Sequence, residues 1–290
     1  MIPTAFQYER ATSLDDALVR LWAADGSAKL LAGGHSLIPL MKLRLSEPAR
    51  LIDIARLREL RGIREQGGRI SIGAATTHHE VATSDLLLAK CPIVAETAAT
   101  IGDQQVRNRG TIGGSVAHAD PGADFPVILT ALTAAFVVQS TAGTRTISVD
   151  DFFTDFFTTA MSANEILTEI HVPLPGAASG SAYTKLPHPA SGYVVVSAGA
   201  SITRQASGTC TASRIAIGGL GSGPLRAIAT EMELQGKPLT PQLITSAAAK
   251  AADESDPVDD PYASADYKKY VATVYARKAI EAAAQRAATN

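Results

Sequence analysis

Apolar residues over the first 54 positions follow two alternating spacings. After Ser13 they fall at helical intervals, at positions 14, 17, 18 and 21, whereas the flanking short apolar runs are typical of strands. Ser13 and Asp16 form the pattern of a capping box, which favours a helix start at this point. The expected elements are strands at 6–8, 29–32 and 50–54 and helices at 13–24 and 37–45. This alternation predicts a small parallel sheet.

The pattern changes after residue 60, where hairpin signals replace the alternation. Gln66-Gly67-Gly68 and Ala142-Gly143 each separate two short strand-like segments, as in β-hairpins. The other expected elements are short helices within 77–101, strands at 166–172, 182–186, 193–203 and 214–218, and helices from 226 onward that an acidic loop at 253–260 interrupts. Pro and Gly make 173–180 the best linker in the chain.

The composition excludes several function classes. Of the 290 residues, 46% are hydrophobic and 19% are charged, which are ordinary values for a globular protein. Twenty-six basic and 28 acidic residues give a net charge of −2, so we expect no nucleic-acid binding. The uncharged segments 125–144 and 186–203 contain too many Thr, Pro, Gly and other weakly apolar residues for a membrane span. We expect no secretory signal and a cytoplasmic location, with any contact to the inner membrane face made through partners.

Metal chemistry is poorly supported by the residue types present. Cys91 and Cys210 are the only cysteines, whereas an iron–sulfur cluster held by this chain alone needs four thiolates. Two buried thiols are favoured over one long-range disulfide. The metal interpretation of His78-His79-Glu80 is disfavoured, because neighbouring side chains diverge and no third ligand is evident. We expect no metal site.

Aromatic side chains are expected to pack in the core. Phe152-Phe153 and Phe156-Phe157 recur four residues apart, and Trp22 lies on the first predicted helix.

Two glycine-rich motifs point to a phosphate ligand. Gly33-Gly34-His35-Ser36 lies between a predicted strand and helix, where glycines let the backbone approach a ligand. Thr111-Ile112-Gly113-Gly114-Ser115 repeats the combination of hydroxyls and paired glycines, and we expect it to precede a helix. Either motif alone is also compatible with an ordinary turn, but two could grip one diphosphate from opposite sides. The one-loop signatures of Rossmann and P-loop proteins are missing.

The residues around both motifs resemble a known family. Ala32-Gly-Gly-His-Ser-Leu-Ile-Pro-Leu-Met-Lys-Leu-Arg-Leu45 and Arg107-Asn-Arg-Gly-Thr-Ile-Gly-Gly-Ser115 are similar to the two FAD-pyrophosphate loops of molybdenum hydroxylase flavoprotein subunits. The resemblance is strongest to the medium subunits of aerobic carbon monoxide dehydrogenases. It continues through 119–126, 165–173, 182–186 and 267–279, and thus covers essentially the whole chain.

The resemblance implies a fold and a set of cofactor-binding residues. The fold is α+β: a two-lobed FAD-binding domain of the vanillyl-alcohol-oxidase/xanthine-dehydrogenase type at 1–177 (lobes about 1–57 and 58–177), followed by a smaller sheet-plus-helices domain at 178–290. The residues implied at the pyrophosphate are Ala32, Gly33, Gly34, His35, Ser36, Thr111, Gly113, Gly114 and Ser115. Asp124 is implied at the ribityl or adenosine part, and Leu167, Lys185 and Tyr193 at the isoalloxazine. The family usually has Asn in place of Ser115, and often has basic residues where Leu186-Pro-His188-Pro follows Lys185.

The implied function is electron transfer through FAD in an oxidoreductase complex. An iron–sulfur small subunit and a molybdenum-binding large subunit are the implied partners, in an (αβγ)2 assembly, and this chain is expected to have no catalytic residue for the substrate. Neither the substrate nor the final acceptor follows from the sequence. Two alternatives stay open: a stand-alone flavin oxidoreductase of the same fold, and a module that binds another phosphorylated ligand.

Overall fold

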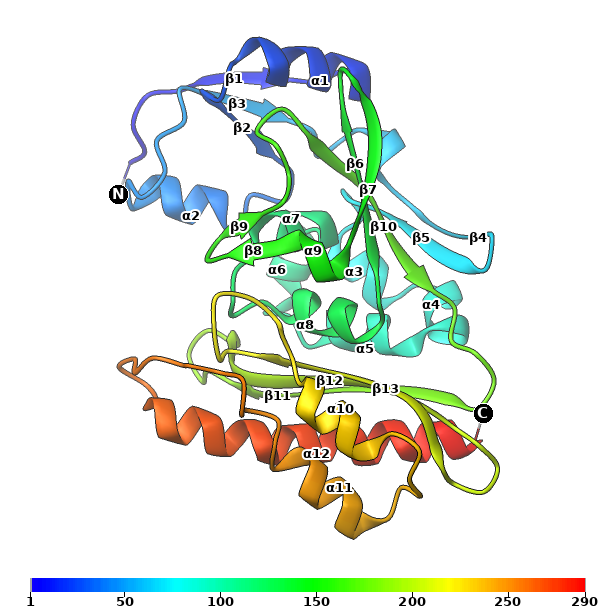
Figure 1. Ribbon diagram of the computed structural model, residues 1–290. Coiled ribbons are helices and arrows are strands. Elements are labelled where there is room, and N and C mark those ends of the chain that lie inside the picture. The colour runs from blue at the N-terminus through cyan, green and yellow to red at the C-terminus, as the bar shows by residue number, and fades with distance from the viewer. Residues whose placement is uncertain (1, 290) are drawn as a thin grey trace.

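The N-terminal part of the chain forms a parallel sheet (Figure 1). The computed structural model describes residues 2–289. The first elements are β1 (Gln7–Arg10), α1 (Leu14–Ala23), β2 (Ala28–Leu31), α2 (Leu37–Lys42) and β3 (Arg50–Asp53). The strand order is β1-β3-β2 and both pairings are parallel, which confirms the sheet predicted from the alternation. The Ser13 hydroxyl accepts a hydrogen bond from the Asp16 N–H at 3.1 Å, so α1 begins where predicted.

The middle of the chain combines a second sheet with several short helices. The strands are β4 (Ile63–Gln66), β5 (Arg69–Gly73), β6 (Ala135–Ser140), β7 (Gly143–Ser148) and β10 (Ile166–Pro173). The helices are η1 (Arg58–Leu60), α3 (His78–Ala82), α4 (Asp85–Lys90), α5 (Pro92–Ala99), α6 (Gln104–Arg107), α7 (Ile112–His118), α8 (Asp124–Ala131) and α9 (Val149–Phe152), and β8 (Phe153–Asp155) pairs with β9 (Thr158–Thr159). The sheet order is β4-β5-β10-β6-β7, all antiparallel, and both predicted hairpins form. Phe125, Phe136 and Phe152 are fully buried in its core.

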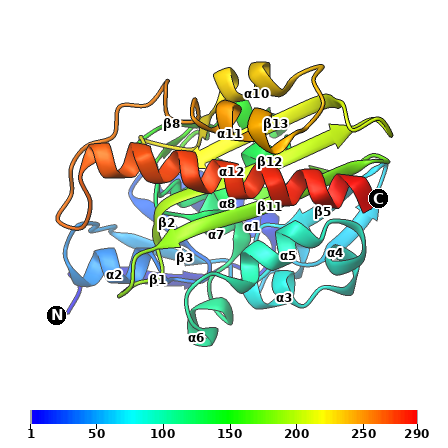
Figure 2. The ribbon, with the colours of Figure 1, turned by 90° about the horizontal axis from the view of Figure 1, so that it is seen from below.

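The C-terminal part is an antiparallel sheet covered by helices on both faces. Its elements are β11 (Ser179–Pro187), β12 (Val194–Arg204), β13 (Cys210–Gly218), β14 (Leu225–Arg226), α10 (Ile228–Leu234), α11 (Pro241–Ala248) and α12 (Ala265–Thr289). Figure 2 shows α12 running along the sheet, and α8 packs on the opposite face of β12 and β13. A Cβ at Gly180 would lie 2.2 Å from the Ala283 carbonyl oxygen, so glycine lets the backbone of α12 approach β11 this closely.

The two uncharged segments, 125–144 and 186–203, form buried elements of the fold. Segment 125–144 forms α8 and β6, and β12 occupies most of 186–203. Strand β12 is buried on both faces from Val194 to Ala200, which is why apolar and small residues occupy consecutive positions there and do not alternate with charged ones. No helix within residues 2–289 has the length and hydropathy needed to cross a bilayer.

The aromatic predictions are only partly correct. Phe152 is buried as expected and its ring centroid lies 4.2 Å from that of Phe136. Phe156 and Phe157 are each 55% exposed, because they occupy the turn between β8 and β9. Trp22 is 62% exposed, since only one face of α1 meets the small sheet and Trp22 is adjacent to the inward-facing Leu21.

Three hydrophobic clusters underlie this arrangement. One joins α1 to the parallel sheet, a second fills the middle of the chain, and a third joins the C-terminal sheet to α10, α11 and α12. The predicted domain boundary at residue 177 falls between β10 and β11. The bounds themselves stay a prediction.

Candidate functional site

The first glycine motif forms a loop with a row of free donors. It joins β2 to α2, and Gly34 has φ +76°, a backbone conformation that favours glycine. None of the backbone N–H groups from Gly33 to Leu37 donates to an acceptor within residues 2–289. The Ser36 side chain makes no capping hydrogen bond to α2, so its hydroxyl is not used to start this helix. Consecutive N–H groups of this kind form a concave binding site for an anion.

The second motif differs from the prediction, because it lies within a helix and not before it. Thr111 is the N-cap of α7, and the two glycines occupy its first turn. The N–H groups of Ile112, Gly113 and Gly114 donate to Thr76 O at 3.0 Å, Ala74 O at 2.9 Å and Thr111 Oγ1 at 3.0 Å, respectively. The motif therefore offers a ligand its hydroxyl groups, including that of Ser115, while its first three amides hold the helix in place.

The first motif lies against the residues that come directly before the second motif. A Cβ built on Gly33 would be 2.3 Å from the Arg109 carbonyl oxygen and 2.8 Å from the Gly110 Cα. A Cβ built on Gly113 would be 2.4 Å from the Ala74 Cβ. Glycine is therefore required at both positions for backbone packing, independently of any ligand. Gly33 and Arg109, which are 76 positions apart in the sequence, thus lie next to each other in the fold.

His78 packs against Gly110, directly before the second motif, and this role was not predicted. It is 5% exposed, its Nδ1 has no hydrogen-bond partner within residues 2–289, and its ring lies 5.4 Å from that of Phe125. A Cβ on Gly110 would be 2.8 Å from the His78 ring. Burial lowers the pKa of His78 to about 4, with smaller contributions from His35 and Arg107. The imidazole is therefore neutral near pH 7.

The residues next to His78 have roles within the fold. Glu80 closes a capping box with Thr77, so its carboxylate is used at the start of α3. No cluster of three or more potential metal ligands occurs within residues 2–289. The only sequence signal for the packing role of His78 was its position directly after Thr77, at the start of a helix.

The low pKa of His78 makes stability depend on pH. The unfolded chain protonates this histidine near pH 6.5, whereas the folded chain does so near 4. Stability is therefore fully present above pH 6.5 and is lost as the pH falls from 6.5 to 4, by about 3 kcal/mol from this group. Urea unfolding from pH 7.5 to 4.5 should show a shallower loss in His78→Gln than in the wild type. Parallel pH profiles in the two proteins would contradict this assignment.

Asp124 and Lys185 form a buried ion pair with each other. Lys185 Nζ lies 2.7 Å from Asp124 Oδ1, and the side chains are 10% and 6% exposed for Lys185 and Asp124. The Tyr183 hydroxyl donates to the same carboxylate oxygen at 2.9 Å. Lys185 Nζ also donates to the carbonyl oxygens of Thr100 and Gly192, each at 3.1 Å. Burial raises the pKa of Asp124, and Lys185 and Tyr183 oppose that shift.

The implied flavin contacts of Asp124 and Lys185 stay predictions, and the structure shows that the two side chains pair with each other. The ammonium group of a lysine has three donors, and three acceptors of the chain already surround it. The contact with Gly192 fixes the residue before Tyr193, so Lys185 also positions the turn between β11 and β12.

Tyr193 and Leu167 occupy contrasting environments. Tyr193 is 47% exposed, and its pKa is raised by burial and by Asp120, while the nearby Ser36 side chain opposes that shift. Tyr193 therefore reaches the first glycine loop from the C-terminal sheet. Leu167 is 4% exposed and belongs to the middle hydrophobic cluster. Its predicted contact with a flavin stays a prediction.

Two family models match the chain, one after the other. The first, described as FAD binding domain in molybdopterin dehydrogenase, matches residues 4–175. The second, described as CO dehydrogenase flavoprotein C-terminal domain, matches residues 181–283.

Curated relatives and solved structures match over nearly the full length. The carbon monoxide dehydrogenase medium chain of Hydrogenophaga pseudoflava is 40% identical, over 99% of this chain and 100% of the relative. The glyceraldehyde dehydrogenase medium chain of Sulfolobus acidocaldarius is 37% identical, over 97% of this chain and 99% of the relative. The crystal structure of quinoline 2-oxidoreductase from Pseudomonas putida 86 contains a chain with a TM-score of 0.93 and 34% identity, over 99% of this chain and all of that one.

Proposed function

The chain belongs to the family of FAD-binding medium subunits of carbon monoxide dehydrogenase and related molybdenum hydroxylases, and we propose that it relays electrons from an iron–sulfur partner to an external acceptor. FAD is the cofactor of this chain. A flavin can accept electrons singly and release them singly or in pairs. The related chains are medium subunits of larger dehydrogenases, so this chain works with partner subunits.

One observation about the site carries the proposal. The N–H groups of Gly33 to Leu37 have no acceptor within the described residues, so they would form the cradle for the pyrophosphate, with the Ser36 and Ser115 hydroxyls as further donors. In this arrangement Thr111 and the amides of α7 hold the second motif rigid, while the first loop provides the backbone donors. Tyr193 would pack beside the flavin, and the Asp124–Lys185 pair holds the turn that carries Tyr193 through the contact of Lys185 with Gly192.

We assign the iron–sulfur clusters to a partner subunit because of the cysteines of this chain. Cys91 and Cys210 are both free and fully buried, so neither is available on the surface as a cluster ligand. The clusters would then reside on a small iron–sulfur subunit and the molybdenum centre on a large one, in an (αβγ)2 assembly. Similar medium chains belong to dehydrogenases named for carbon monoxide and for glyceraldehyde. We therefore infer that the large subunit, and not this chain, determines which substrate is oxidised.

A titration of the purified chain with FAD tests the proposed cradle. We expect one FAD per chain, and Ser36→Ala should weaken binding about tenfold or more, because a hydrogen bond to a charged group contributes about 1.5–3 kcal/mol. Ser207→Ala, in the exposed turn between β12 and β13, is the matched control and should bind FAD like the wild type. Equal affinity in all three proteins would remove Ser36 from the site.

The same preparation separates the relay from the alternative function. A relay subunit should show no steady turnover of carbon monoxide, aldehydes or N-heterocycles until its iron–sulfur and molybdenum partners are added. Sustained oxidation of such a substrate by the isolated FAD-loaded chain would instead support a stand-alone oxidoreductase.

A further inference from the structure

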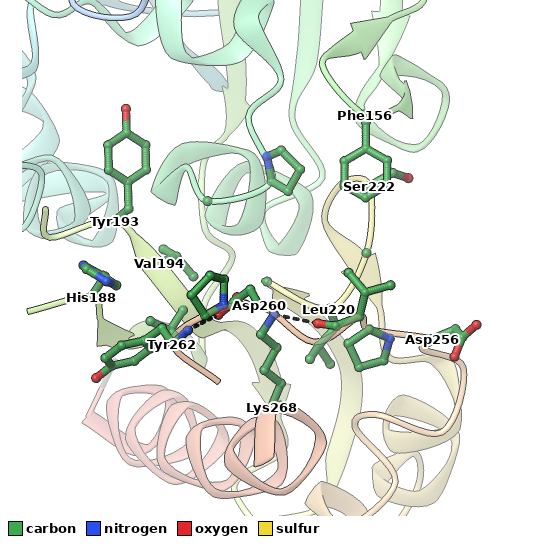
Figure 3. A pocket seen from close by; sticks show the side chains of 18 of the residues that line it. Phe156, His188, Tyr193, Val194, Leu220, Ser222, Asp256, Asp260, Tyr262 and Lys268 are labelled. Carbon is green, nitrogen blue, oxygen red and sulfur yellow. Dashed lines mark hydrogen bonds and ion pairs between the residues drawn. The ribbon is translucent and has the colours of Figure 1, made fainter. Parts of the chain in front are cut away.

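A groove on the middle sheet lies apart from the predicted flavin contacts. A larger cavity, of about 690 Å³, has Tyr193 at its edge (Figure 3) and therefore adjoins those contacts. The groove has a volume of about 370 Å³ and is enclosed by the β4–β5 turn, the start of β6, the middle of β7 and the end of β10. None of the residues on its wall belongs to a glycine motif or to the other predicted flavin contacts. Small-molecule sites have volumes of about 300–1,000 Å³, so the groove can hold a separate ligand.

The register of the sheet gathers polar side chains on the face that carries the groove. Alternate residues of β5 and β10 are buried in the middle hydrophobic cluster, so Arg69, Ser71 and His171 point to the opposite face. His171 pairs with Ser71 in β5 and with Ala135 in β6. Because the Ala135 side chain is small, the groove stays open beside His171.

Arg69 provides the groove with an unpaired cation. Its side chain is exposed, and within residues 2–289 it makes no ion pair and no hydrogen bond. Arg64 and His171, by contrast, both contact Glu169: Arg64 forms an ion pair with it, and His171 Nε2 lies 2.8 Å from Glu169 Oε2. The wall contains no acidic residue, so the Arg69 guanidinium has no counterion there and favours an anion. A guanidinium presents parallel N–H donors that match the two oxygens of a carboxylate.

Ser71 and Thr133 distinguish the groove from an ordinary surface depression. Ser71 is 1% exposed, and its Oγ has no hydrogen-bond partner among the residues that the structure describes. Buried hydroxyl groups are rarely left without a partner, and Ser71 lies directly beside His171 of the wall. Thr133 also lies on the wall and has φ +56°, a conformation that glycine usually adopts after a helix. Both features cost free energy that a bound ligand can offset.

From these contacts, we propose that the groove binds a small organic monocarboxylate with a planar, apolar body. The carboxylate pairs with the Arg69 guanidinium, and the body lies against Ala135, Pro173 and the His171 ring that Glu169 holds in place. A single negative charge matches the one unpaired cation of the wall, whereas a phosphate dianion exceeds it. The inference goes beyond the proposed relay function and does not depend on it, because the groove shares no residue with the flavin contacts.

Binding of a carboxylate to the FAD-loaded chain can be measured without turnover. The probes are 4-fluorobenzoate and its uncharged isostere 4-fluorobenzamide, followed by fluorine NMR relaxation of the ligand. We expect the carboxylate to bind at least about tenfold more tightly than the amide, because only the carboxylate forms an ion pair with a guanidinium. Equal affinities for the two probes would contradict the proposal.

Arg69→Gln tests the cation of the groove. It removes a charge at an exposed position and should weaken 4-fluorobenzoate binding at least about tenfold. Arg56→Gln is the matched control, since Arg56 is also exposed, makes no ion pair among the described residues and lies outside the groove. We expect the control to bind the probe like the wild type, with equal FAD content and equal urea unfolding midpoints in both variants.

Thr146→Trp tests the location of the ligand. Thr146 lies on the wall in the edge strand β7, where an aromatic side chain is well tolerated. Thr144→Trp is the control, because Thr144 is exposed on the same face of the same strand but lies outside the groove. We expect probe binding to be lost in Thr146→Trp only. Unchanged affinity in both Arg69→Gln and Thr146→Trp, or a wild-type chain that does not bind 4-fluorobenzoate, would overturn the proposed site, whereas FAD binding and the relay function would be unaffected.

Discussion

Replacing Gly33 by alanine should lower the affinity for FAD by about 100-fold or more, equivalent to about 3 kcal/mol of binding free energy. The added Cβ would lie 2.3 Å from the Arg109 carbonyl oxygen and 2.9 Å from the Arg109 carbonyl carbon, and backbone atoms cannot rotate away as a side chain can. The first loop must therefore move away from the second motif. That movement separates the free N–H groups of the first loop from the hydroxyls of the second motif, so one pyrophosphate can no longer contact both.

Gly114→Ala separates a packing effect from a general effect of removing a glycine. A Cβ at Gly114 would meet one atom within 4 Å, the capping Thr111 Oγ1 at 2.8 Å, so this substitution strains one side-chain contact at the start of α7 and no backbone contact. We expect Gly114→Ala to weaken FAD binding much less than Gly33→Ala. FAD affinity and urea unfolding should be measured for both variants and for Gly176→Ala as a surface control. Wild-type affinity in Gly33→Ala would refute the idea that the contact between the motifs forms the site.

The order of elements could be predicted because each depends on short-range patterns. The helical spacing after Ser13 and the Gly pairs at the two hairpins are local signals, and the structure contains those elements. The position of the second motif was predicted less well. Thr111 is an N-cap by residue type, but the glycines that follow are poor helix formers, so their place inside α7 depends on tertiary contacts with Ala74 and Thr76.

The contacts between the site residues could not be predicted from the sequence, because the residues are far apart along the chain. The family resemblance implied Asp124 and Lys185 near a cofactor, yet nothing within their local sequences indicates a contact 61 positions apart. The same applies to His78, whose neutrality follows from burial behind Gly110 and not from its neighbours along the chain. For Phe156 the prediction was wrong. Its aromatic side chain was expected in the core, but it is exposed and lines a cavity.

Lys185→Met should destabilise the protein by about 3–5 kcal/mol at pH 7.5, because it leaves the Asp124 carboxylate buried without its cation. Only the Tyr183 hydroxyl would still donate to that carboxylate from a side chain. The double variant Lys185→Met/Asp124→Leu removes both charges and should recover much of the loss. Urea unfolding of the wild type, both single variants and the double variant gives the coupling free energy between the two residues.

The pH dependence of Lys185→Met provides an independent check on this pair. Burial already raises the pKa of Asp124, and removal of Lys185 raises it further, so the carboxyl group becomes neutral more readily as the pH falls. An acid with a raised folded-state pKa contributes stability that is present at low pH and lost as the pH rises through that pKa. The stability difference between the wild type and Lys185→Met should therefore shrink from pH 7.5 to 4.5. Because His78 is unchanged in both proteins, its titration cancels, and a constant difference would mean that Asp124 is not the group that Lys185 stabilises.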